Sequence, residues 1–149
     1  MTVSIHPLTL ARPGSRASLL ALMAGLLAPA AFAAETAASG EQVYKQVCMA
    51  CHATGVANAP KFGDRTAWTP LIKEGQEVLT AHAWVGVRAM PPKGGQADLP
   101  LDAFARATAY MARTAGGNWT DPDAAMLGRI RAEEAKWRRV IKEQSITGG

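Results

Sequence analysis

Five consecutive residues, Cys48-Met49-Ala50-Cys51-His52, constrain this chain more than any other feature of its sequence. They contain both cysteines of the 149 residues, with a histidine directly after the second. On a helical turn, positions i, i+3 and i+4 lie on one face, so both thiols and the imidazole share a side. Such thiols can add across the two vinyl groups of a haem while the imidazole binds its iron. The motif therefore predicts one covalently attached haem c, held by Cys48 and Cys51, with His52 as an iron ligand.

Two cysteines at this spacing have two other uses in proteins, a zinc site and a redox-active dithiol. A zinc site needs further ligands, and the chain has no second Cys/His pair. A thioredoxin-like dithiol belongs in a βαβ setting, which the sequence does not indicate. Haem attachment is the interpretation that uses the histidine as well as both thiols.

The N-terminal segment, residues 1–33, has the three parts of a secretory signal peptide. Arg12 and Arg16 supply basic charge, residues 19–27 are apolar, and residues 31–33 (AFA) form a small-x-small cleavage site. Cleavage there predicts an exported, periplasmic protein that is soluble, whereas an uncleaved segment would anchor the protein to a membrane.

The basic residues slightly outnumber the acidic ones. The full chain has 16 Lys or Arg and 12 Asp or Glu, a formal net charge of +4. Without Arg12 and Arg16, 14 basic and 12 acidic residues remain, which gives +2. Two haem propionates would bring this charge near zero, so the balance does not support binding of nucleic acid.

Helix and turn signals alternate over residues 34–117, which we expect to form the haem domain. No stretch shows the alternation of a strand, so the predicted class is all-α. We expect helices over residues 40–50, 70–73, 76–87 and 98–115, with Ser39 as the first N-cap and a loop over residues 54–69. Residues 90–95 (MPPKGG) cannot form a helix, because prolines and glycines interrupt it.

Four methionines beyond the signal are candidates for a second, sulfur ligand of the iron. Met49 lies in the attachment turn, Met111 in a helical stripe and Met126 in the tail. Met90 differs, because two prolines keep the backbone after it extended and two glycines then allow a tight turn. A rigid loop that presents one sulfur suits an axial ligand, so Met90 is the predicted ligand. His82 is the alternative.

Residues 40–115 resemble the class I cytochromes c, most closely the bacterial cytochrome c5 group. The matching residues are Gly40, Tyr44, the CMACH motif, Ala59-Pro60-Lys61, Gly63-Asp64, Trp68, Ala89-Met90-Pro91-Pro92, Gly94-Gly95 and Tyr110-Met111. The resemblance implies helices wrapped around one haem, with the first and last helices crossing. It also implies a one-electron carrier that is not an enzyme and that serves respiratory or periplasmic redox partner proteins.

The resemblance also implies local contacts. Gly40 and Tyr44 would meet Phe104 or Tyr110 at the helix crossing. The Pro60 carbonyl would accept a hydrogen bond from the His52 ring, as outer partners of metal ligands do. Trp68 would either donate its N–H to a haem propionate or simply pack. Some members of the group carry an extra cysteine pair near the methionine loop, and this chain has none.

Residues 118–149 lie beyond the resemblance. They predict a charged amphipathic helix over residues 122–144, whose apolar face is Met126, Leu127, Ile130, Trp137, Val140 and Ile141. This helix either folds back on the haem domain or docks to a partner or a second copy, and its basic end also suits an anionic membrane. The oligomeric state is left open.

Two functions compete with a mobile carrier. One is a fixed haem subunit of a dehydrogenase or oxidase complex, docked by its tail. The other is a haem peroxidase or ligand sensor, which would need an open iron position and hence an absent or labile Met90.

Overall fold

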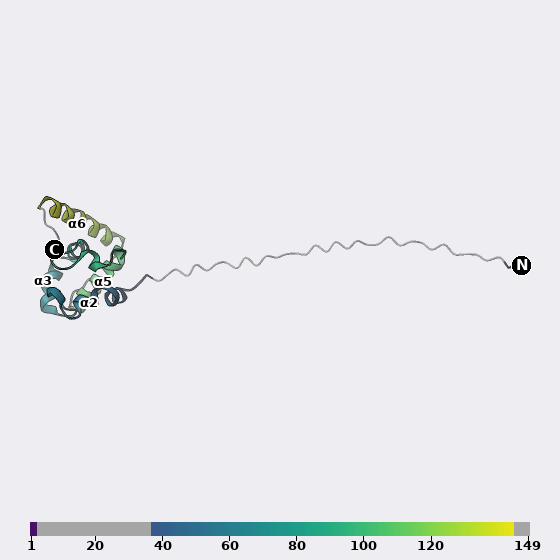
Figure 1. The fold of residues 1–149 in the computed structure, drawn as a ribbon, viewed down its shortest axis with the longest axis horizontal. Helices are drawn as coiled ribbons and strands as arrows, with labels where there is room; N and C mark the ends of the chain where they lie inside the picture. The colour runs from purple at the N-terminus through teal and green to yellow at the C-terminus, as the bar shows by residue number, and fades with distance from the viewer. Residues whose placement is uncertain (3–36, 145–149) are drawn as a thin grey trace. The chain divides into compact units, whose positions relative to one another are not determined.

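The computed structural model describes residues 1–2 and 37–144, and helices account for most of these residues (Figure 1). The elements are α1 (Gly40–Val43), η1 (Tyr44–Cys48), α2 (Met49–His52), η2 (Val56–Asn58), α3 (Arg65–Lys73), α4 (Gln76–Val85), η3 (Pro92–Gly95), α5 (Leu101–Thr114) and α6 (Ala124–Glu143). Within the described residues the only β pairing is an isolated bridge between Val87 and Met90, so the predicted all-α class is confirmed. Apart from its first two residues, the predicted signal peptide lies outside the described residues.

The segment that carries the CMACH residues is helical without a break from Gly40 to His52. Ser39 begins it with a reciprocal cap, in which its hydroxyl accepts from the Gln42 amide at 3.2 Å and the Gln42 side chain accepts from the Ser39 amide at 2.8 Å. The middle stretch, η1, has π-helical hydrogen bonds, which in α-helices are frequent at functional sites. This stretch ends at Cys48, the first residue of the motif.

The first helical segment crosses α5 at Gly40, where no side chain would fit. A Cβ at this position would lie 2.3 Å from the backbone oxygen of Arg106 and 3.0 Å from Cβ of Tyr110. One turn further on, the Tyr44 ring lies 5.9 Å from the Tyr110 ring and stacks at 4.3 Å on Phe62. The predicted crossing is therefore confirmed, with Tyr110 as the aromatic partner.

Arg106 ties the start of the first helix to α5. Its Nε donates to the backbone oxygen of Ala38 at 2.9 Å, and its guanidinium pairs with Asp102 one turn earlier, also at 2.9 Å. Partial burial alone would raise the pKa of Asp102, but hydrogen bonds from Arg106 and from backbone amides, together with the Arg106 charge, bring it below its usual value.

Several predicted helix boundaries are wrong. α3 begins at Arg65 instead of residue 70, because the Asp64 carboxylate accepts hydrogen bonds from the amides of Thr66 and Ala67 at 3.0 and 3.1 Å. α4 ends at Val85, since the next residue is a glycine with φ of 92°. α5 begins three residues later than expected, at Leu101, after Pro100 in an extended conformation.

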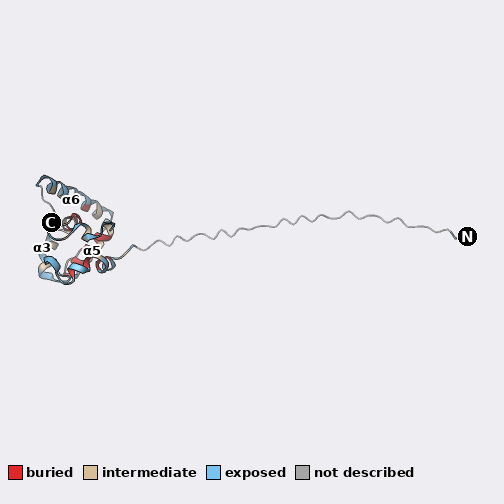
Figure 2. Ribbon diagram, in the orientation of Figure 1, coloured by how far each residue is buried: buried red, intermediate tan, exposed pale blue. Residues whose placement is uncertain are grey.

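The tail helix, α6, packs against α4 and also touches α5. It begins after Asp123, whose carboxylate accepts from the Met126 amide at 2.7 Å. Its outer side is exposed (Figure 2). On its inner side, Ile130 is fully buried. The tail therefore folds back on the preceding helices, and Val140, which we placed on the apolar face, is instead 38% exposed. None of the helices described by the structure is long and apolar enough to cross a bilayer.

Gly40→Ala is expected to lower the free energy of unfolding by about 3 kcal/mol, because its Cβ would meet backbone atoms that cannot move independently. Gly128→Ala is the matched control, since nothing lies within 4 Å of a Cβ there, and it is expected to add about 0.5–1 kcal/mol by removing a helical glycine. Urea unfolding of the two variants measures both effects. A Gly40→Ala variant as stable as the wild type would contradict the crossing geometry.

Asp102→Asn is expected to cost about 0.5 kcal/mol at pH 7, a value reduced for the partial exposure of the ion pair. The folded-state pKa lies below the unfolded one, so the stabilisation is present above the unfolded pKa and is lost as the pH falls through the folded pKa. The variant and the wild type should therefore converge only as the pH falls below the folded-state pKa of Asp102. Urea unfolding at neutral pH and at successively lower acidic pH tests this, with Asp98→Asn as the control for an exposed carboxylate.

Candidate functional site

One cavity of about 410 Å³ gathers all four residues that the sequence analysis singled out as haem or iron ligands. Cys48, Cys51 and His52 line it from the first helical segment, and Met90 lines it from the loop after α4. Most of the remaining lining is apolar and includes Val47, Val56, Pro60, Trp68, Leu71, Leu79, Ala83, Phe104 and Met111. The volume lies within the range of about 300–1,000 Å³ that ligand pockets span.

The two cysteines differ in their surroundings. Cys48 is buried and Cys51 is exposed, and neither forms a disulfide. Burial, and then the neighbouring Cys51, raises the pKa of the Cys48 thiol to about 11. Reactive dithiols depend on a lowered pKa, so this arrangement opposes the dithiol alternative.

The His52 ring is fixed by the loop that follows it. Its Nδ1 lies 2.9 Å from the Pro60 carbonyl, which assigns the proton to Nδ1 and leaves Nε2 with a free lone pair. The predicted bond to Pro60 is thereby confirmed. The backbone oxygen of His52 also accepts from the Phe62 amide at 2.7 Å, so the loop is bonded to the residue whose ring it orients.

Trp68 supports the same loop from α3. Its indole N–H donates to the backbone oxygen of Lys61 at 2.8 Å, and its ring lies 6.3 Å from the His52 ring. Of the two roles considered for this residue, the structure shows packing, with the N–H engaged by the backbone instead of free for a propionate. Sequence patterns carry no signal for this bond, because any backbone carbonyl can accept it.

The loop that presents Met90 is a closed turn. Val87 and Met90 exchange both backbone hydrogen bonds, at 3.1 and 2.9 Å. Gly86 has φ of 92°, and a Cβ there would lie 3.0 Å from Pro92, so this position requires glycine. Arg88 and Lys93 adopt left-handed φ values of 55°. Residues 92–95 form tight turns at η3, in agreement with the prediction that no regular helix occurs here.

The sequence analysis named His82 only as the alternative iron ligand and missed the two side chains that hold it, Glu74 and Trp137. His82 lines the cavity, and its Nδ1 lies 3.3 Å from a carboxylate oxygen of Glu74, which also lines it. The His82 ring stacks on Trp137 of α6, with the ring centres 4.5 Å apart. The apolar stripe of α6 predicted that Trp137 is covered, but nothing in the sequence named its partner.

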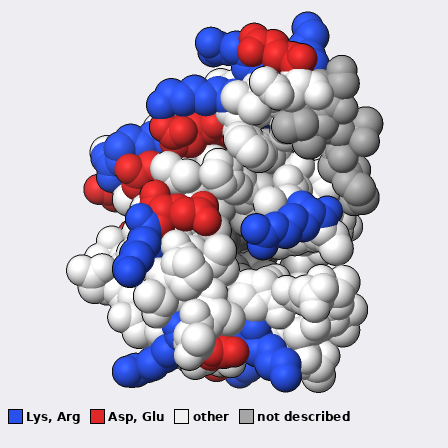
Figure 3. Space-filling model, turned by 90° about the vertical axis from the view of Figure 1, so that its left-hand side faces the viewer, with Lys and Arg blue, Asp and Glu red and all other residues white. Residues whose placement is uncertain are grey.

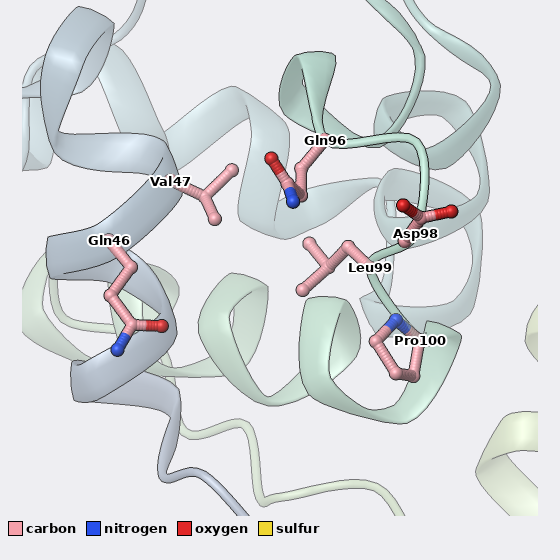
Figure 4. A pocket seen from close by; sticks show the side chains of 6 residues that line it. All are labelled: Gln46, Val47, Gln96, Asp98, Leu99 and Pro100. Carbon is pink, nitrogen blue, oxygen red and sulfur yellow. The ribbon is translucent and has the colours of Figure 1, made fainter.

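A second, more open hollow of about 340 Å³ lies between η1 and the segment before α5 (Figure 4). It is lined by Gln46, Val47, Gln96, Asp98, Leu99 and Pro100. Its lining has no thiol, thioether or imidazole, so the groups able to bind haem or iron meet only in the larger of the two cavities.

Comparison with known proteins agrees with this geometry. A family model described as cytochrome C oxidase, cbb3-type, subunit III matches residues 35–111. Cytochrome c5 of Azotobacter vinelandii is 44% identical over 77 residues, which are 50% of this chain and 93% of the relative. Cytochrome c-555 of Chlorobaculum thiosulfatiphilum is 40% identical over 79 residues, 50% of this chain and 92% of the relative.

One solved structure is also similar, a chain from a crystal structure of an electron transfer complex of nitrite reductase with cytochrome c. It is 46% identical and has a TM-score of 0.49, and the match covers 51% of this chain and 93% of that one. The tail helix α6 lies beyond the residues that the family model matches.

The cavity and its donors fit a covalently bound haem. An apolar space flanked by two thiols, an imidazole with a free Nε2 and a thioether offers what haem c requires of a protein. The chain belongs to the cytochrome c family, as a class I member similar to cytochrome c5, and its cofactor is covalently attached haem c.

Proposed function

We propose that this protein is an exported one-electron carrier between redox partner proteins. Cys48 and Cys51 form the thioether bonds to the haem, and His52 and Met90 bind its iron. The observation that carries the proposal is that these four side chains, from two separate segments, line one apolar cavity. The relatives, all cytochromes, support electron transfer as the activity.

When bound, haem c supplies an iron that takes up and releases one electron. The residues of the chain keep the ligands in place in both oxidation states. The Pro60 carbonyl fixes the orientation of the His52 ring, and the hydrogen-bonded turn from Val87 to Met90 fixes the thioether. A site whose ligands do not move between the two states needs little rearrangement when an electron passes.

A peroxidase or ligand sensor would need an open position on the iron. Met90 lies in the wall of the cavity on a short, hydrogen-bonded turn, which favours a closed site and hence the carrier.

Electrons would pass where the cavity wall reaches the surface. Several of its lining residues are exposed: Cys51, Val56, Ala57, Asn58, Arg88 and Ala89. Of the two cations near Met90, Lys93 is engaged, because its ammonium lies 4.9 Å from the Trp84 ring centre and donates to the Ala97 carbonyl. Arg88 is exposed and therefore better placed to orient an acidic partner at this edge.

The chain would have three parts in this function. Residues 1–33 act as the signal peptide, residues 34–117 hold the haem, and residues 118–149 extend that domain. Residues 37–123 contain eight Lys or Arg and eight Asp or Glu, whereas α6 contains six basic and three acidic residues. Blue and red side chains follow one another in the upper part of Figure 3, where α6 lies in Figure 1. The excess of basic over acidic residues in residues 37–143 therefore lies on α6.

Replacing both cysteines, Cys48→Ser with Cys51→Ser, is expected to abolish covalent haem attachment. The wild type should keep its haem after denaturation, and the variant should lose it, because no thioether bond remains. Haem staining after denaturing electrophoresis of the exported fraction measures this. Haem that stays on the denatured double variant would refute the assignment of the two thiols.

Met90→Ala is expected to remove the weak methionine–iron band at the red end of the ferric spectrum. Loss of the thioether should also lower the reduction potential, by on the order of 0.2 V within the range of about 0.8 V that axial ligands span. Met49→Ala is the matched control, because Met49 is exposed. This variant should keep the band. A Met90→Ala protein that keeps the band and the potential of the wild type would show that another residue binds the iron.

A further inference from the structure

We propose that Trp137, on the C-terminal helix α6, is a positioning residue for the iron site. It supports the wall formed by α4 through His82 and thereby keeps Met90 on the iron. This inference rests on the proposed function, in which Met90 is the second iron ligand. It makes α6 a working part of the haem site, although α6 lies beyond residues 35–111, which match the family model.

The first step is the contact between Trp137 and His82. The two ring centres are 4.5 Å apart at an interplanar angle of 42°, a tilted stack of the kind that aromatic rings favour. On another side, His82 Nδ1 lies 3.3 Å from Glu74 Oε2. His82 and Glu74 both line the large cavity. The imidazole is thus held between α6 and the end of α3, with the cavity beside it.

The second step leads from α4 to Met90. Trp137 and Ile141 of α6 pack against a buried cluster of Ala83, Trp84, Val85 and Phe104, and Met90 packs against the same cluster. α4 ends at Val85, and only one residue separates it from the turn that Val87 and Met90 close. The position of α4 therefore sets the position of the turn and of its sulfur.

The third step is the attachment of α6 itself. Ile130, with no exposed surface, packs with Ala81 of α4 and Ala105 of α5. Before the helix, the side chain of Gln76 donates to the Thr120 carbonyl at 2.8 Å, which ties the incoming chain to the start of α4. The chain is therefore held against α4 from Thr120 to Ile141. Because α6 is fixed in this way, Trp137 is held firmly against His82.

A second attachment joins this segment to α5. Arg113 donates to the Trp119 carbonyl at 3.2 Å and pairs with the Asp121 carboxylate at 2.9 Å. Trp119 is itself buried in the core. The connection between α5 and α6 is thus bonded on both sides of Thr120, and the helix cannot swing about it freely.

The iron site has two states in this account, one with Met90 bound and one with Met90 released. Packing from α6 favours the bound state, because Trp137 and Ile141 hold in place the buried cluster against which Met90 also packs. A smaller side chain at position 137 loosens that packing. The released state should then be more populated in a protein that is still folded, which a purely structural role for Trp137 does not require.

Trp137→Ala and Trp137→Phe, made in the haem-loaded full chain, test the proposal. Carbon monoxide is the probe, because it binds the ferrous iron when the methionine leaves. We expect Trp137→Ala to bind carbon monoxide about tenfold faster than the wild type, a change of about 1.4 kcal/mol in the balance between the two states. Phenylalanine keeps an aromatic ring, and the indole N–H has no hydrogen-bond partner among the described residues, so Trp137→Phe should stay close to the wild type.

Val140→Ala is the matched control, because Val140 lies on the same helix, three residues further along, and is exposed. It should leave carbon monoxide binding unchanged.

In a denaturant titration, Trp137→Ala should lose the methionine–iron band before its helices unfold, as followed by far-UV circular dichroism. A variant that unfolds earlier but binds carbon monoxide at the wild-type rate while folded would overturn the proposal, because Trp137 would then serve stability alone.

The route through His82 has its own test. His82→Ala should speed carbon monoxide binding as Trp137→Ala does, and the double variant should be little faster than either single one. Fully additive effects would show that Trp137 does not act through His82.

If Trp137→Ala yields no folded protein, Trp137→Leu replaces it with the same expectations. A wild type that lacks the methionine band and binds carbon monoxide at once would instead refute Met90 as the ligand, and hence the proposed function.

Discussion

The contact of Gly40 with the backbone of Arg106 fixes the geometry on which the rest of the domain depends. The first helical segment is continuous from Gly40 to His52, so the place where it crosses α5 also sets where its far end lies. That end carries the two cysteines and the histidine, whereas α5 supplies Phe104 and Met111 to the same cavity. A small shift at the crossing would therefore change the width of the cavity, which the same helical segment lines at its far end, from Val47 to His52.

The two sides of the cavity are stabilised in different ways. On the side of His52, support comes from nearby sequence, because Pro60, Lys61 and Phe62 bind the ring or its neighbours through backbone atoms. On the side of Met90, the turn is local but the wall behind it is not, since it is built from α4 and α6. Backbone hydrogen bonds fix a position closely, whereas packing of side chains tolerates small rearrangement. A change in the packing of a distant segment can therefore affect the methionine side of the cavity more than the histidine side.

Much of the site could be predicted from sequence because its signals are local. The CMACH spacing, the proline and glycine residues around Met90 and the Ser39 cap each act within a few residues. The start of α3 was missed, since Asp64 follows a run of turn residues and its capping role depends on which way the next residues turn. The stack of Trp137 on His82 joins residues 55 positions apart, and an apolar stripe does not specify the surface that it covers.

The two faces of α6 have a joint consequence. Its inner face packs on the wall behind Met90, and its outer face carries the positive excess of the described chain. A protein that binds the outer face more tightly in one ligation state than in the other must shift the balance between those states. By thermodynamic linkage, the ligation state changes the affinity of that protein by the same factor. Binding of a protein to the surface of α6 and binding of Met90 to the iron would then be coupled through this one helix.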